Sequence, residues 1–135
     1  MRKRSRLILA LDETDERKAL EVADSVGDLV DAIKINWPLV LSTSPEIITR
    51  ISRSSEVICD FKVADIPNTN KLIVCEAVKR GASGVIVHAF TGSDSVTAAV
   101  TNSTQRAPAS TRNTPNPRIR VGLGPQRIPM RRWRA

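Results

Sequence analysis

The chain has few of the side chains on which several classes of protein depend. It contains two cysteines, one histidine and no tyrosine among 135 residues, and aromatic residues make up only 3%. A single histidine and two widely separated cysteines do not provide the closely spaced ligands of a zinc site. Cys59 and Cys75 lie in apolar sequence, which predicts small buried thiols in a reducing compartment. We therefore expect no metal, no cofactor held by such ligands and no disulfide.

Long apolar runs are also missing. The run that follows the basic start of the chain, Leu7 to Leu11, ends at Asp12. It is too short for the core of a signal peptide, and no run approaches the roughly 20 residues of a membrane-spanning helix. These absences predict a cytoplasmic protein without a membrane partner.

The positive charge is confined to one end of the sequence. The net charge is +7, but residues 101–135 hold eight of the 21 basic residues and no acid, so residues 1–100 carry 13 basic residues against 14 acidic ones. Five of the eight prolines also lie in 101–135. A change of composition this abrupt predicts a folded unit over 1–100 and a disordered Arg/Pro-rich tail over 101–135.

The first hundred residues alternate short apolar runs with helical patterns. The continuous apolar runs are typical of strands buried on both faces of a parallel sheet. The predicted strands span 7–12, 32–36, 56–62 and 84–88, and the predicted helices span 14–26, 45–53, 69–80 and 93–100. A polar residue stands at or near the end of each strand: Asp12, Lys34, Asp60 and His88. The pattern predicts an α/β fold, either a (β/α)8 barrel or a doubly wound sheet, because both bind ligands at the carboxyl ends of their strands.

Charged residues are concentrated in the stretch Asp-Phe-Lys-Val-Ala-Asp-Ile-Pro-Asn-Thr, residues 60–69. Strand side chains alternate between faces, so Asp60 and Lys62 are expected on one face and Phe61 on the other. Pro67 should break the chain, with Asn68 or Thr69 capping the next helix. The plain alternative is a solvated strand end with an incidental ion pair. A lysine among carboxylates beside a buried strand favours a functional site.

This stretch resembles the active-site signature of orotidine 5′-phosphate decarboxylase in its short, archaeal-type form, and the resemblance covers roughly residues 6–100. It implies a (β/α)8 TIM barrel of which the first four βα units are present. It further implies a carboxy-lyase of pyrimidine biosynthesis, which converts orotidine 5′-phosphate (OMP) to UMP and carbon dioxide without a metal or cofactor.

The resemblance also implies roles for individual residues. Asp60 matches the carboxylate set against the departing carboxylate of the substrate, and Lys62 matches the general acid that protonates the ring carbon. Asp12 matches an acid that binds the ribose hydroxyls, and Lys34 matches a lysine between the ribose and the first acid of the motif.

Three further matches imply a homodimer. Asp65 corresponds to an acid that reaches into the neighbouring subunit's site, and Ile66 and Thr69 correspond to residues that accompany it across the interface. We therefore expect Asp65 to be catalytic and the other two to contribute to substrate binding.

Two alternatives stay open. Sister sugar-phosphate lyases and synthases of the same superfamily usually place a glutamate where Lys34 stands and use a metal, which favours the decarboxylase. Beyond residue 100 the resemblance stops, and the family's phosphate-binding loops are not recognisable. The tail is then either a truncated or out-of-frame product, with impaired activity, or a natural arm that binds RNA or another polyanion. The first is favoured because the tail has no repeats and Trp133 is its one aromatic residue.

Overall fold

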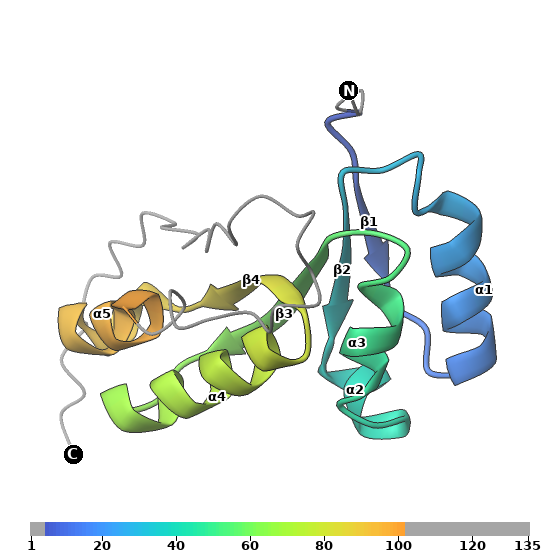
Figure 1. Ribbon diagram of the computed structural model, residues 1–135. Helices are drawn as coiled ribbons and strands as arrows, with labels where there is room; N and C mark the ends of the chain where they lie inside the picture. Colours follow the sequence, from blue (N-terminus) through green and yellow to red (C-terminus); the bar gives the residue numbers. More distant parts are fainter. Residues whose placement is uncertain (1–4, 102–135) are drawn as a thin grey trace, which may run out of the picture.

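The computed structural model describes residues 5–101, which form four strands, five α-helices and one 3-10 helix. In chain order these are β1 (Ile8–Leu11), α1 (Glu16–Val26), β2 (Ala32–Asn36), α2 (Trp37–Ser42), α3 (Ile47–Ile51), β3 (Val57–Val63), α4 (Pro67–Lys79), β4 (Ala82–Val87), η1 (Ala89–Thr91) and α5 (Ser93–Thr101). All neighbouring strands pair in parallel, in the order β1-β2-β3-β4 (Figure 1). The predicted parallel α/β sheet is confirmed. The predicted tail lies outside the described residues, apart from Thr101 at the end of α5.

A row of buried side chains crosses all four strands. Leu11 pairs with Ile35, Ile35 with Cys59, and Cys59 with Val85. All four are buried. Because successive strand residues point to opposite faces, the residues one position further along, Asp12, Asn36 and Asp60, are expected on the other face. The register of the apolar core therefore also sets the register of the polar residues at the strand ends.

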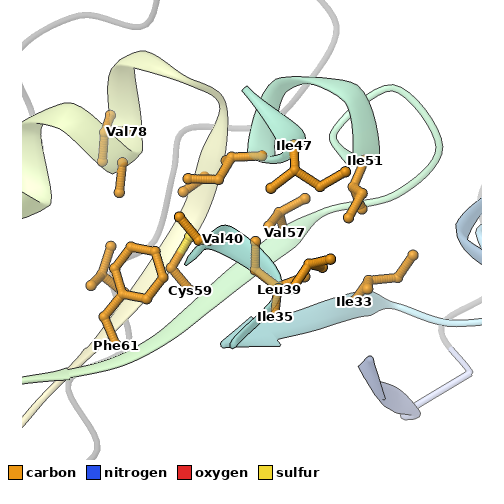
Figure 2. Close-up of a cluster of buried hydrophobic side chains, with 14 of the residues drawn as sticks. Ile33, Ile35, Leu39, Val40, Ile47, Ile51, Val57, Cys59, Phe61 and Val78 are labelled. Atoms are coloured by element: carbon orange, nitrogen blue, oxygen red, sulfur yellow. The ribbon is translucent and has the colours of Figure 1, made fainter. Parts of the chain in front are cut away.

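Helices cover the face of the sheet that carries this row. Figure 2 shows side chains of β2 and β3 meeting those of α2 and α3, and most of them are completely buried. Ile35 is one of these, and its replacement by alanine would cost about 2–5 kcal/mol of stability. Strand residues expected on the other face of the sheet, such as Lys34, Ile58 and Ile86, are half-buried. The second face is thus the more open one in residues 5–101.

Helix starts differ from the sequence prediction in two places. Asp15, not Thr14, caps α1, and its carboxylate accepts a hydrogen bond from the backbone N–H of Lys18 at 2.9 Å. Helix α4 starts at Pro67 with Ile66 as its N-cap, so neither Asn68 nor Thr69 caps it. Proline suits the first position of a helix because that position has no intrahelical acceptor for an N–H.

One helix was not predicted. The six-residue helix α2 follows β2 directly, with Asn36 as its cap and Pro38 in its first turn. It is too short to show a helical period in the sequence, and it is held by tertiary contacts of Leu39 and Val40, which are both buried.

Two glycines end helices for different reasons. Gly81 lies between α4 and β4 with φ of +99°, a backbone conformation that other residues rarely adopt. Gly27 has an ordinary helical φ of −54°, but a Cβ there would lie 2.5 Å from the carbonyl oxygen of Ser54. Close packing, and not backbone freedom, requires glycine at position 27.

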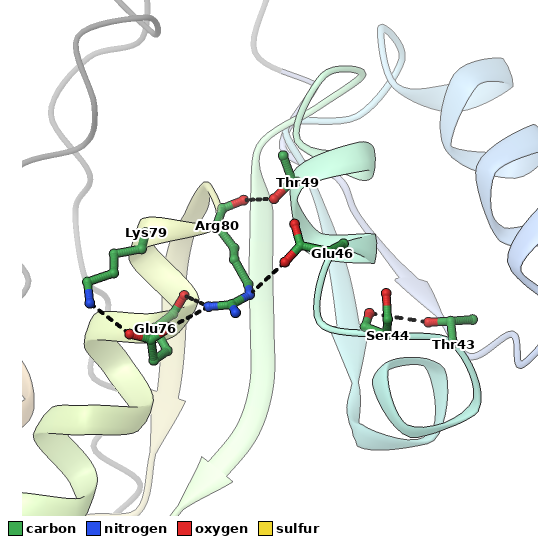
Figure 3. Close-up of polar contacts among 7 residues, drawn as sticks. All are labelled: Thr43, Ser44, Glu46, Thr49, Glu76, Lys79 and Arg80. Carbon is green, nitrogen blue, oxygen red and sulfur yellow. Dashed lines mark hydrogen bonds and ion pairs between the residues drawn. The ribbon is translucent and has the colours of Figure 1, made fainter.

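Charged side chains join α3 to α4 near the amino ends of β3 and β4 (Figure 3). Glu76 forms ion pairs with Lys79 at 2.7 Å and with Arg80 at 2.5 Å. Arg80 also pairs with Glu46 at 3.3 Å, and its carbonyl accepts a hydrogen bond from the Thr49 hydroxyl at 3.0 Å. We call Glu46, Glu76, Lys79 and Arg80 the Glu76 cluster. Contacts of this kind fasten two helices together on the side of the sheet that typically contributes stability.

The two cysteines form no disulfide. Burial raises the pKa of the Cys59 thiol to about 12. Cys59 thus behaves as a small apolar core residue, as predicted, whereas Cys75 is half-buried. No helix within residues 5–101 combines the length and apolarity needed to cross a membrane.

Candidate active site

The carboxylate of Asp60 lies between two lysines. Lys34 of β2 approaches Oδ2 at 3.0 Å, and Lys62 of β3 approaches Oδ1 at 2.9 Å. The Asp60 side chain is only 10% exposed, against 34% for Lys34 and 58% for Lys62. We call these three residues the Asp60 cluster. It has one negative and two positive charges, so it offers a net positive surface around a shielded carboxylate.

Asp60 stays ionised despite its low exposure. Burial alone would raise the pKa of its carboxyl, but the hydrogen bonds and charges of Lys62 and Lys34 outweigh burial and lower the pKa below its usual value of 3.8. An ionised carboxylate therefore lies between two lysine side chains before any ligand arrives. Such preorganised charges act strongly where water is partly excluded.

The backbone of Lys62 is strained. Its φ is +47°, in the left-handed region that costs a non-glycine residue about 1–2 kcal/mol. Strand β3 is also irregular here. Cys59 pairs with Val85 and Val63 pairs with Val87, so β3 advances by four residues where β4 advances by two. Cys59, Phe61 and Val63 are buried and Lys62 is exposed, and Lys62 pairs with Asp60, as the predicted placement of Asp60 and Lys62 on one face requires. Irregular strands often re-aim a side chain at a functional site.

Trp37 holds the strained segment from the neighbouring helix. Its indole N–H donates a hydrogen bond to the carbonyl oxygen of Phe61 at 3.0 Å, and the two rings stack with centroids 4.1 Å apart. Phe61 directly precedes Lys62. The first residue of α2 thus fixes the backbone that carries the lysine.

Asp12 and Asn36 extend the polar row toward β1. The side-chain amide of Asn36 donates to Asp12 Oδ1 at 2.5 Å, and Asn36 is in register with Asp60. The structure therefore places Asp12, Asn36 and the Asp60 cluster along the carboxyl ends of three neighbouring strands. Sequence reasoning missed Asn36. Its pairing with Asp60 was the available signal, but it required knowledge of the strand register.

The other predicted site residues lie beyond the end of β3. Asp65 is exposed, and its Oδ1 accepts a hydrogen bond from the N–H of Ile66 at 2.7 Å. Within residues 5–101 it forms no ion pair with Lys34 or Lys62. Ile66 is 65% exposed, and Thr69 is half-buried in the first turn of α4. Within residues 5–101 no hydrogen bond or ion pair joins these three residues to the Asp60 cluster. Residues 5–101 hold no group of three or more His, Cys, Asp or Glu side chains placed to bind a metal ion.

A parallel sheet in chain order, with helices on one face and polar residues at the carboxyl ends of its strands, has the architecture of a (β/α)8 barrel, of which this chain covers the first part. A sequence model of the Orotidine 5'-phosphate decarboxylase / HUMPS family matches residues 5–113. The chain belongs to this family, and the match extends past residue 100.

Individual relatives agree with this assignment. The chain is 57% identical over 96 residues to orotidine 5'-phosphate decarboxylase of Thermoplasma acidophilum, covering 71% of this chain and 45% of the relative. The crystal structure of the enzyme from Pyrococcus horikoshii OT3 is 46% identical with a TM-score of 0.68, covering 70% of this chain and 46% of that one. The structure from Methanocaldococcus jannaschii complexed with inhibitor BMP is 52% identical with a TM-score of 0.68, covering 72% and 46%. The chain spans about half the length of the relatives it matches.

Proposed function

We propose that this chain carries the carboxylate and lysine part of an orotidine 5′-phosphate decarboxylase active site, which converts OMP to UMP and carbon dioxide. The observation that carries the proposal is the ionised, shielded Asp60 held between Lys34 and Lys62. Membership of the family and the identity to archaeal decarboxylases support it.

The arrangement suits the loss of carbon dioxide from a ring. As the bond between the ring carbon and the carboxylate breaks, its electron pair remains on the carbon. The ammonium of Lys62 stabilises this developing negative charge and then donates its proton to the carbon. Asp60 sets a second negative charge against the substrate carboxylate, which favours departure as neutral carbon dioxide. Side chains alone perform these steps, so the proposal includes no cofactor.

Further residues have roles in the same proposal. Asp12, held by Asn36, binds ribose hydroxyls, and Lys34 lies between the ribose and Asp60. Asp65, Ile66 and Thr69 reach a neighbouring subunit's site in a homodimer, which is consistent with the exposure of Asp65 and Ile66 in the single chain. A cytoplasmic location is part of the proposal as well.

The sister lyase activity is less well supported. Sister enzymes usually have a glutamate at this position and use a metal ion. Here the Lys34 ammonium lies 3.0 Å from Asp60 Oδ2, so a side chain of the protein supplies the positive charge beside the carboxylate. Polyanion binding by the tail concerns residues outside the described part of the chain.

Ligand titration followed by NMR of labelled lysine side chains tests the proposal. UMP and OMP should shift the signals of Lys34 and Lys62, while Lys79 in the Glu76 cluster should stay unchanged and serve as the matched control. Inorganic phosphate alone should produce smaller shifts, because it lacks the ribose and the ring. Unchanged Lys34 and Lys62 signals at saturating nucleotide, or equal shifts at Lys79, would contradict the proposal.

A further inference from the structure

Buried polar side chains are rare in the described part of the chain, and half of them contact one residue. Four polar or charged side chains are buried within residues 5–101: Ser55, Asp60, Asn70 and Ser95. Asn70 is 0% exposed and Ser95 is 2% exposed. Both form hydrogen bonds with the backbone of Asp65.

The two contacts use both polar groups of the Asp65 backbone, its N–H and its carbonyl oxygen. Its N–H donates to Asn70 Oδ1 at 2.9 Å, and its carbonyl oxygen accepts from the Ser95 hydroxyl at 2.8 Å. Asn70 belongs to α4 and Ser95 to α5, and these two helices pack against each other. Two residues earlier, the Val63 carbonyl accepts from the N–H of His88 at 2.9 Å. Hydrogen bonds thus join the backbone of Asp65 to two helices, and a third hydrogen bond, two residues earlier, joins the chain to His88 after β4. The carboxylate of Asp65 remains exposed.

The burial of these two polar groups carries a cost. Transfer of an amide or hydroxyl out of water is unfavourable unless hydrogen bonds replace those with water. Within residues 5–101, the Asn70 side-chain N–H2 has no hydrogen-bond partner, so this residue remains incompletely satisfied. An apolar side chain at either position would avoid this desolvation cost, but it would leave one backbone group of Asp65 without its partner. What the polar side chains add is the fixed position of Asp65.

Ordinary capping of α4 explains only one of the contacts. Asn70 lies one turn into α4, and a side chain there that accepts from a backbone N–H before the helix is a local feature of helix starts. Ser95, in contrast, is 30 residues away along the chain and bonds the other backbone group of the same residue. A local cap has no need for this second, tertiary contact.

We propose that Asn70 and Ser95 are positioning residues that present the Asp65 carboxylate to its target. The inference rests on the proposed function, in which Asp65 is the acid that reaches the neighbouring subunit's site. Fixing the backbone leaves only the side-chain torsions of Asp65 to be ordered when the carboxylate engages, which lowers the entropic cost of that step.

Amide hydrogen exchange and 15N relaxation at Asp65 test the inference in the full chain. Ser95→Ala removes the donor, and Asn70→Leu removes the acceptor at similar volume. Ser95→Thr keeps the hydroxyl. Ser55→Ala is the matched control, because Ser55 is buried but its hydroxyl makes no hydrogen bond within residues 5–101. Asn70→Leu should speed exchange at the Asp65 amide by about fivefold or more. Ser95→Ala should lower its 15N–1H NOE, and Ser95→Thr should restore it.

The outcomes separate positioning from general stability. Native behaviour at Asp65 in Ser55→Ala, together with altered exchange in Asn70→Leu and an altered NOE in Ser95→Ala, supports the inference. Equal changes at Asp65 in Ser55→Ala and Ser95→Ala, or a fast-exchanging Asp65 amide in the native chain, overturn it. Because these measurements need no turnover, failure of the positioning inference is distinguishable from failure of the proposed decarboxylation, which the nucleotide titration reports.

Discussion

Each end of the sheet carries a carboxylate between two cations, and the two differ in how the partners are supplied. Glu76 pairs with Lys79 and Arg80, three and four residues along the same helix, and its side chain is 52% exposed. Asp60 pairs with Lys34, 26 residues away on another strand, and with Lys62 on a strained backbone, and it is 10% exposed. Pairs at helical spacing follow from local geometry. A shielded, non-local cluster has to be maintained by the whole fold, and this difference points to function at the carboxyl ends of the strands.

The largest expected difference in stability comes from removing each carboxylate. Asp60→Ala leaves two lysines facing each other without their shared acid, and we expect a loss of about 1.5–3 kcal/mol. Glu76→Ala removes only exposed ion pairs, so we expect a clearly smaller loss. Urea denaturation measures both. Equal losses would mean that the two clusters are alike and would remove the basis of the comparison.

Backbone strain should reverse the usual ranking of glycine and alanine. At position 62, with its positive φ, Lys62→Gly should be more stable than Lys62→Ala by about 1 kcal/mol. At position 79, the last residue of α4, Lys79→Gly should instead be less stable than Lys79→Ala by about 0.5–1 kcal/mol. A Lys62→Gly variant that is less stable than Lys62→Ala in denaturation experiments would show that Lys62 is unstrained.

A smaller difference concerns titration in salt. Lys79 and then Arg80 lower the pKa of Glu76 below 4.5, while the two lysines hold Asp60 below 3.8 against burial. Salt screens exposed charges more than shielded ones. In 1 M salt, by NMR titration, we expect the Glu76 pKa to return toward its usual value and the Asp60 pKa to stay lowered. An Asp60 pKa that recovers as fully as that of Glu76 would contradict the shielding.

The lowered Asp60 pKa also sets the pH dependence of stability. Because the folded-state pKa lies below the unfolded value, the contribution of Asp60 is complete above pH 3.8 and is lost as the pH falls through the lower folded-state pKa. Asp60→Asn should therefore show a flatter decline of unfolding free energy in acid than the native chain. An unchanged acid profile in the variant would refute this linkage.

Much of this fold could be predicted from the sequence, because the apolar runs of β2 and β3 are buried and bounded by polar residues. The proximity of Asp60 to Lys34 followed from their places near parallel strand ends. The contribution of Asn36 could not be predicted, because it depends on the register between strands. The positive φ of Lys62 coincides with a register shift between β3 and β4, and its support comes from Trp37 in another element. Local sequence encodes neither of these tertiary features.

The release of labelled carbon dioxide from carboxyl-labelled OMP tests the central claim most directly. The native chain should release label above the buffer blank, at a rate that the sequence predicts to be impaired. Lys62→Ala should lower this rate by about 10²-fold or more, whereas Lys79→Ala should leave it within about twofold. Equal release above the blank by the native chain and by Lys62→Ala would contradict the assignment of chemistry to the Asp60 cluster.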